Sequence, residues 1–153
     1  MKAQSTKSNI IGKWKLTRIA FPSGLSFDTD SLTSSYKQFF NKQKQEAYKG
    51  KITENDSLFI QYQFEKAVND VSKMFIEFRN NNVYVTNHYE KGELTDKAES
   101  GKYNYNSANK TITAYVGNSK RVSAKYKISQ PTTGILILKS NDGTIMKCKK
   151  IKE

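Results

Sequence analysis

The sequence has very few of the residues from which catalytic and metal sites are usually built. Its 153 residues include one cysteine, Cys148, and one histidine, His88. A single cysteine excludes an internal disulfide, and a single histidine excludes a multi-histidine metal site. No glycine-rich phosphate loop occurs, and nothing in the sequence pairs Glu77 with Glu99 as acid and base. We therefore expect no catalytic residues, no metal and no cofactor, in a protein that is not an enzyme.

Long apolar runs are also missing, including the apolar core of an export signal. No stretch approaches the roughly 18 apolar residues of a membrane span, so we expect no transmembrane segment. Residues 1–9 are polar and lack periodicity, which predicts a flexible N-terminal arm. Residues 2–4 (Lys-Ala-Gln) resemble the end of an export signal, with a small residue before the cut. We expect a periplasmic or secreted protein trimmed from a precursor; a short disordered start of a cytoplasmic protein is the alternative.

The chain is instead rich in strand patterns. Residues 10–21 alternate so that Trp14, Leu16 and Arg18 share one face, and residues 22–24 (Pro-Ser-Gly) end this strand. After Met74 the apolar residues keep a period of two. His88 falls on the opposite face of its strand from Val85, and we expect this face to point outward. Seven further strands are expected at about 76–79, 83–89, 103–105, 112–116, 121–128, 135–139 and 144–151, separated by turns rich in Asn and Gly.

An insertion at about residues 29–74 departs from this pattern and predicts two helices. The first runs over about 31–48, from Asp30 or Ser31 as N-cap to Gly50. The second begins at Thr53 or Asp56 and ends near Met74; a period of two also fits residues 58–64, but residues 65–70 are good helix formers. We expect the pair to pack across one open end of a barrel as a lid. The side chains expected to face that end are Phe39, Phe40, Phe64, Val68 and Val71.

The Gly12-x-Trp14 motif near the N-terminus resembles the first strand of the lipocalins and of bacterial lipocalin-like (calycin-type) families of unassigned function. Eight strands joined mostly by hairpins must also hide their edges, and a closed barrel removes them. We therefore expect a mainly β protein: an eight-stranded antiparallel up-and-down barrel in one domain (10–153), with the helices between its first and second strands. Gly12 and Trp14 are its structural anchor. The last strand offers only lysines in place of the arginine that packs over the tryptophan in many lipocalins, and the helix that follows their barrel is missing.

The charge is concentrated in the first and last strands. The net charge is +12, and residues 101–153 carry eleven basic and two acidic side chains, while residues 1–20 carry five basic and none acidic. In a closed antiparallel barrel these strands are neighbours, so one flank should be strongly basic, with Lys125, Lys127, Lys147 and Lys149 on the outward face or rim. Only three basic residues are arginines, the side chains that bind phosphate through two parallel hydrogen bonds. The lysine-rich surface instead favours non-specific electrostatic attraction of anions.

Two functions are compatible with this pattern. The first is non-enzymatic carriage or sensing of a small apolar or amphiphilic ligand in the barrel lumen, with Arg18 binding a ligand carboxylate; the same side chains could equally fill the barrel as a packed core. The second is docking of an anionic glycan, lipid headgroup or acidic protein on the lysine-rich outer face, for which a merely solvated surface is the alternative. Nucleic acid is disfavoured as a partner because the sequence shows no set of exposed aromatic side chains on which bases could stack. The expected lumen residues are Leu16, Arg18, Phe78, Val85, Tyr103, Tyr105 and Tyr126.

Overall fold

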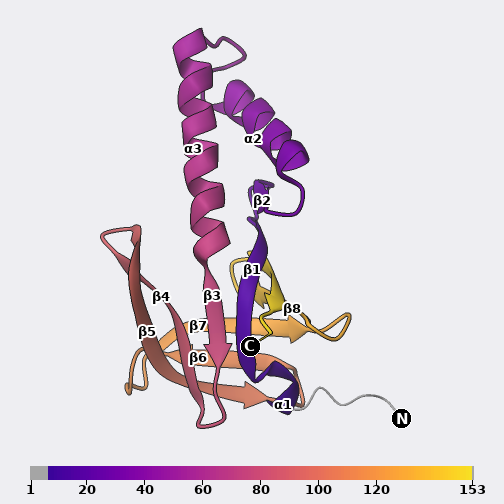
Figure 1. Cartoon of the computed structure of the whole chain (residues 1–153), viewed down its shortest axis with the longest axis vertical. Coiled ribbons are helices and arrows are strands. Elements are labelled where there is room, and N and C mark those ends of the chain that lie inside the picture. Colours follow the sequence, from indigo (N-terminus) through magenta and orange to yellow (C-terminus); the bar gives the residue numbers. More distant parts are fainter. Residues whose placement is uncertain (1–6, 153) are drawn as a thin grey trace.

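The computed structural model describes residues 7–152, and its centre is a closed antiparallel barrel (Figure 1). Among the described residues nine strands form one sheet, and β1 also pairs with β9, which closes eight of them into a ring. The predicted eight-stranded barrel is confirmed. Its strands are β1 (Gly12–Ala20), β3 (Phe75–Phe78), β4 (Val83–Glu90), β5 (Glu93–Asn106), β6 (Thr111–Tyr115), β7 (Val122–Ser129), β8 (Ile135–Ser140) and β9 (Ile145–Lys150).

The ninth strand, β2 (Ser26–Asp28), lies outside the ring. It folds back on the end of β1 over a turn at residues 22–24 and pairs with Arg18–Ala20. A buried serine then connects it to the helices, because the Ser35 hydroxyl donates to the Ser26 carbonyl at 2.7 Å and accepts from the Asp28 N–H. The insertion therefore begins by lengthening the barrel wall at β1.

A short helix closes the end of the barrel at which β1 begins. In α1 (Lys7–Ile10), Ile10 is fully buried, and its carbonyl accepts a 2.8 Å hydrogen bond from the Trp14 indole N–H. We expected residues 1–9 to form a flexible arm; residues 7–9 instead belong to this helical turn, because Ile10 and Trp14 hold it against the barrel. Residues 1–6 lie outside the described part of the chain.

The insertion forms the two predicted helices, α2 (Leu32–Glu46) and α3 (Glu54–Lys73). Thr53 is the N-cap of α3, and its hydroxyl and the Asp56 carboxylate satisfy each other's backbone N–H groups in a capping box. Leu58 and Tyr62 lie on the exposed side of α3, opposite the buried Ile60 and Phe64, which explains why this stretch also fits a strand period. In the described part of the chain, no helix is both long enough and apolar enough to cross a membrane.

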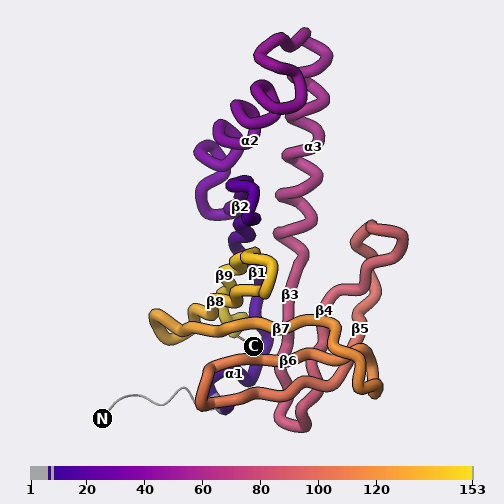
Figure 2. Tube along the Cα trace, turned by 180° about the vertical axis from the view of Figure 1, so that it is seen from behind, coloured from indigo at the N-terminus to yellow at the C-terminus, as the bar shows by residue number. Residues whose placement is uncertain are grey.

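The helix pair stands up from the barrel instead of lying across it as a lid (Figures 1 and 2). α3 runs straight into β3, and the helices pack mainly on each other, β1 and β2. Phe39 and Phe64 turn toward Phe27 of β2, with ring centroids 5.5 and 5.8 Å from it. The expected lid residues thus extend the barrel core into an aromatic cluster around Phe27. The sequence could not reveal this cluster because β2 is too short to give a periodic signal. Of the five, Phe39, Phe64 and Val71 are buried and Phe40 and Val68 are half-buried.

A β-bulge in β1 changes the direction of Arg18, which was predicted to point into the lumen. The pairing of β1 with β9 shifts between Leu16 and Arg18, so that Leu16 lies opposite Cys148 but Arg18 lies opposite Lys147. The extra residue is Thr17, whose carbonyl accepts hydrogen bonds from Thr29. As a result Arg18 is exposed on the outer surface, and the prediction of an inward Arg18 is wrong.

The faces of β4 are also the reverse of those predicted. Tyr84 is buried in the core, whereas Val85, an expected lumen residue, lies opposite Glu77 on the other face of the strand and is half-exposed. The reason is the residue paired with Tyr84 in β5, which is Gly101. The tyrosine ring crosses above this glycine, and its hydroxyl donates to the Tyr115 carbonyl of β6 at 2.9 Å.

Candidate functional site

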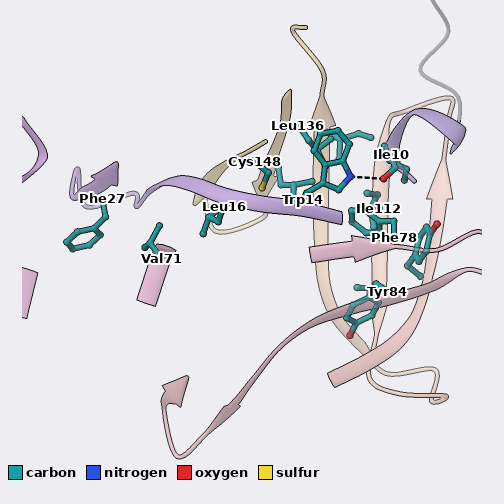
Figure 3. Packing of buried hydrophobic residues seen from close by; sticks show 14 of the residues in the cluster. Ile10, Trp14, Leu16, Phe27, Val71, Phe78, Tyr84, Ile112, Leu136 and Cys148 are labelled. Carbon is teal, nitrogen blue, oxygen red and sulfur yellow. Dashed lines mark hydrogen bonds between the residues drawn. The ribbon is translucent and has the colours of Figure 1, made fainter. Parts of the chain in front are cut away.

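The barrel interior near Trp14 is a packed core (Figure 3). Phe78, Ile112, Leu136 and Leu138 are at most 1% exposed, and the rings of Phe78 and Tyr103 meet edge to face at 5.1 Å. Leu16, Phe78 and Tyr103 therefore lie inside as predicted, but they fill the space rather than line an open one. Tyr105 and Tyr126 are half-buried and pack against the same core. Of the seven expected lumen residues, only Arg18 and Val85 lie outside.

Burial also makes the interior chemically inert at Cys148. The side chain is 2% exposed, and desolvation raises the pKa of its thiol to about 12. A nucleophilic cysteine needs the thiolate form, which this environment disfavours. Burial likewise raises the pKa of Tyr126. Neither Cys148 nor Tyr126 is therefore an activated nucleophile.

The few acid–base side chains are dispersed over separate pairs. His88 Nδ1 lies 3.0 Å from the Glu99 carboxylate on the β4–β5 hairpin, and Glu77 pairs with Arg79 at 3.2 Å. Glu77 is thus paired with Arg79 and Glu99 with His88, and the two glutamates belong to separate pairs. No group of three or more metal-ligating side chains occurs within residues 7–152. This distribution gives no constellation from which we could build a reaction.

The most distinctive surface is a field of cations on the outside of β7, β8, β9 and β1, which we call the basic face. All of its cationic side chains are exposed. Four of them, Lys125, Lys127, Lys147 and Lys149, were expected on the outer surface from the sequence. The bulge at Thr17 adds Arg18 to them. The basic face consists of Lys15, Arg18, Lys125, Lys127, Lys139, Lys147 and Lys149.

Within the basic face, cations lie directly opposite cations on neighbouring strands. The register pairs Lys127 with Lys139, Arg18 with Lys147, and Lys15 with Lys149. Side chains opposite one another in an antiparallel pair have Cβ atoms about 5 Å apart, and like charges there destabilise the sheet. Among the ion pairs within residues 7–152, one reaches this face, from Asp30 to Lys149 at 3.0 Å. Asp28 of β2 also lies opposite Arg18 in the register. The positive charge is therefore concentrated and only partly compensated, by Asp28 and Asp30.

A further cation, outside the basic face, lies over the tryptophan ring. The Lys150 ammonium lies 5.6 Å from the centre of the Trp14 ring, where the sequence offered no arginine. Gly12 makes room for this arrangement: its φ is +128°, and a Cβ there would come within 2.8 Å of Lys150 Cε. A cation over an indole face is attracted by the ring quadrupole. Lys150 therefore has both a structural partner and an accessible ammonium group.

Comparison with known proteins supports the fold and leaves the chemistry open. No protein-family profile matches the chain, and no curated protein matches its sequence. The crystal structure of a DUF4847 family protein from Bacteroides vulgatus ATCC 8482 is similar to it, with a TM-score of 0.54 over 94% of this chain and 95% of that one. The two sequences are 11% identical, so the similarity concerns the fold alone. The chain has the architecture of a closed eight-stranded antiparallel barrel with a helical insertion.

Proposed function

We propose that this protein is a non-enzymatic binding module that docks a linear anionic glycan on the basic face. The main support is that the register of β1, β7, β8 and β9 places cationic side chains directly opposite one another on neighbouring strands. Such pairs lower the stability of the isolated protein. A polyanion lying across the strands would neutralise them, so the arrangement is favourable when the ligand is bound.

The geometry favours an extended polymer over a compact ligand. The cations come from four adjacent strands, which are spaced about 4.8 Å apart, so they form a band across the sheet. Lysine is a flexible point charge and suits repeated anionic groups without fixed geometry. An anionic lipid headgroup or an acidic protein could dock on the same face, and the experiment below distinguishes these partners from a glycan. An exported location, which residues 2–4 suggest, would place the protein where such glycans occur.

Charge reversal tests this function and separates it from stability. In Lys127→Glu/Lys147→Glu, each new carboxylate lies opposite a cation, at Lys139 and Arg18. We expect the affinity for heparin, used as a probe, to fall about 100-fold, because about 1 kcal/mol is lost per removed contact and repulsion is added. The free energy of unfolding should stay unchanged or rise by about 0.5–2 kcal/mol. Isothermal titration calorimetry and urea denaturation measure the two quantities.

The matched control reverses two lysines outside the basic face, Lys37→Glu and Lys97→Glu, with the same change in net charge. Both side chains are exposed, on α2 and β5. We expect this variant to bind heparin within about threefold of wild type, because neither residue lies on the strands of the basic face and exposed charges are screened over roughly 10 Å. Equal losses in both variants would contradict a localised site. Binding only to vesicles containing anionic lipid, or only to a polyglutamate chain, would replace the glycan with that partner.

A further inference from the structure

A groove of about 650 Å³ opens at the end of the barrel that carries Trp14 and α1. It lies between the β7–β8 loop and Lys110, which directly precedes β6. Its volume falls within the range of roughly 300–1,000 Å³ that is typical of small-molecule sites. The residues that determine its chemistry are Trp14, Lys110, Ile128, Gln130, Thr132 and Lys150.

The groove has an apolar floor and walls that are held in place. Trp14 and Ile128 contribute the floor, although each is at most 3% exposed. The Gln130 side-chain N–H donates to the Asn9 carbonyl at 3.0 Å and ties the β7–β8 loop to α1. At the other end of the loop, the Lys150 N–H donates to the Gly134 carbonyl at 2.9 Å. A ligand would therefore meet a preformed surface, which reduces the entropy lost on binding.

The charge in the groove has one sign. Lys110 and Lys150 both line it, and no carboxylate of residues 7–152 does. Lys150 is held over the Trp14 ring, as described above. Lys110 adopts a left-handed backbone (φ +54°), which is uncommon for a residue other than glycine, and its carbonyl accepts from the Ile128 N–H. Neither lysine forms an ion pair with a carboxylate of residues 7–152.

We propose that this groove binds a small organic dianion whose apolar part lies on Trp14 and Ile128. Two ammonium groups without a carboxylate suit two negative charges, and charge-assisted hydrogen bonds are the strong ones. The apolar floor favours an anion with an aromatic or aliphatic body over a bare inorganic ion. Neither Lys110 nor Lys150 belongs to the basic face, so the test of this site does not depend on whether a glycan binds there.

The single tryptophan allows a direct test with phenyl phosphate as the probe. The Trp14 indole N–H gives the only indole cross-peak in a ¹H–¹⁵N correlation spectrum, since the chain has one tryptophan. We expect this peak to shift saturably with phenyl phosphate. Benzyl alcohol and inorganic phosphate should each bind at least about tenfold more weakly, because each lacks one of the two interactions. Equal affinity for phenyl phosphate and benzyl alcohol would overturn the role of the ammonium groups, and no shift at millimolar concentrations would overturn the site.

Matched lysine variants complete the test. Lys110→Asn removes one ammonium and keeps a residue that tolerates the left-handed backbone; we expect phenyl phosphate to bind about tenfold more weakly. Lys120→Gln removes the same charge in the β6–β7 turn, at the opposite end of β6, and should bind like wild type. The spectrum itself reports whether each variant is folded. Wild-type affinity in Lys110→Asn, or the same loss in Lys120→Gln, would overturn the proposal.

Discussion

Replacing Trp14 with alanine is expected to lower the free energy of unfolding by about 3–5 kcal/mol, the range for a buried large aromatic residue. The side chain is 1% exposed, and Trp14 is connected to α1, β3 and β9. Its indole N–H holds α1 through the Ile10 carbonyl, its ring carries the Lys150 ammonium, and its backbone pairs with Ile76 of β3. Loss of the ring would leave a cavity and release α1. Urea denaturation followed by far-UV circular dichroism measures the effect without tryptophan fluorescence.

Trp14→Phe is the matched control, because it keeps an aromatic ring and removes the indole N–H. We expect it to cost less than the alanine variant, since part of the packing remains and one hydrogen bond of about 1 kcal/mol is lost. An alanine variant that melts within a degree or two of wild type would show that Trp14 does not anchor this barrel. The resemblance of Gly12-x-Trp14 to the lipocalin motif would then have no structural meaning here.

Replacing Gly101 with alanine is expected to destabilise the barrel by about 3 kcal/mol or more. A Cβ at this position would lie 2.3 Å from the Tyr115 carbonyl oxygen and 2.7 Å from Cε1 of Tyr84. The first contact is with backbone, so it can be relieved only by moving β5 relative to β6. Overpacking of a well-packed core usually costs about 1–3 kcal/mol, and a clash with backbone belongs at the upper end. Urea denaturation of the purified variant measures this loss.

Ser100→Ala provides the control for this prediction, because Ser100 is the exposed neighbour of Gly101 in β5. It should change the free energy of unfolding by no more than about 0.5 kcal/mol. Tyr84→Phe separates the hydroxyl from the ring, and we expect it to cost about 1 kcal/mol through the lost bond to the Tyr115 carbonyl. Wild-type stability in Gly101→Ala would mean that Tyr84 does not cross β5 as described.

Local sequence signals predicted the elements of this fold well. The Thr53–Asp56 capping box marks the start of α3, and the left-handed Asn82 follows from the asparagine turn between β3 and β4. Gly143 ends the β8–β9 turn with φ +93°. Each of these features depends on a few adjacent residues, which is why sequence reasoning could reach them.

The directions of individual side chains depended on contacts that are distant in sequence. Both faces of β4 carry strand-forming residues, and the choice between Tyr84 and Val85 was made by Gly101 on the neighbouring strand. A glycine within a strand often marks the close approach of another group, so a signal was present. The bulge that turns Arg18 outward left no comparable signal, because residue 17 is an ordinary threonine and its hydrogen-bond partners come from β2 and β9.

The candidate sites were predicted only in part. The uneven distribution of charge predicted a basic flank, but not that its cations would face one another, since register is set by the whole barrel. The groove at Trp14 was missed altogether. Lys110 and Lys150 are forty residues apart, and they line one groove only because β6, β7, β8 and β9 are consecutive strands of the sheet. The empty lumen that the lipocalin resemblance suggested is filled near Trp14 by residues such as Ile112 and Leu136, which the alternation alone could not distinguish from pocket walls.

The salt dependence of glycan binding tests the central claim most directly. Each lysine that neutralises an anionic group releases condensed counterions, so the logarithm of the association constant falls linearly with the logarithm of salt concentration, by roughly 0.7–0.9 per contact for nucleic acids. For heparin and wild-type protein we predict a slope of about −3 to −5, and for Lys127→Glu/Lys147→Glu a slope smaller in magnitude by about two. A slope near zero, or the same slope in both proteins, would contradict docking on the basic face.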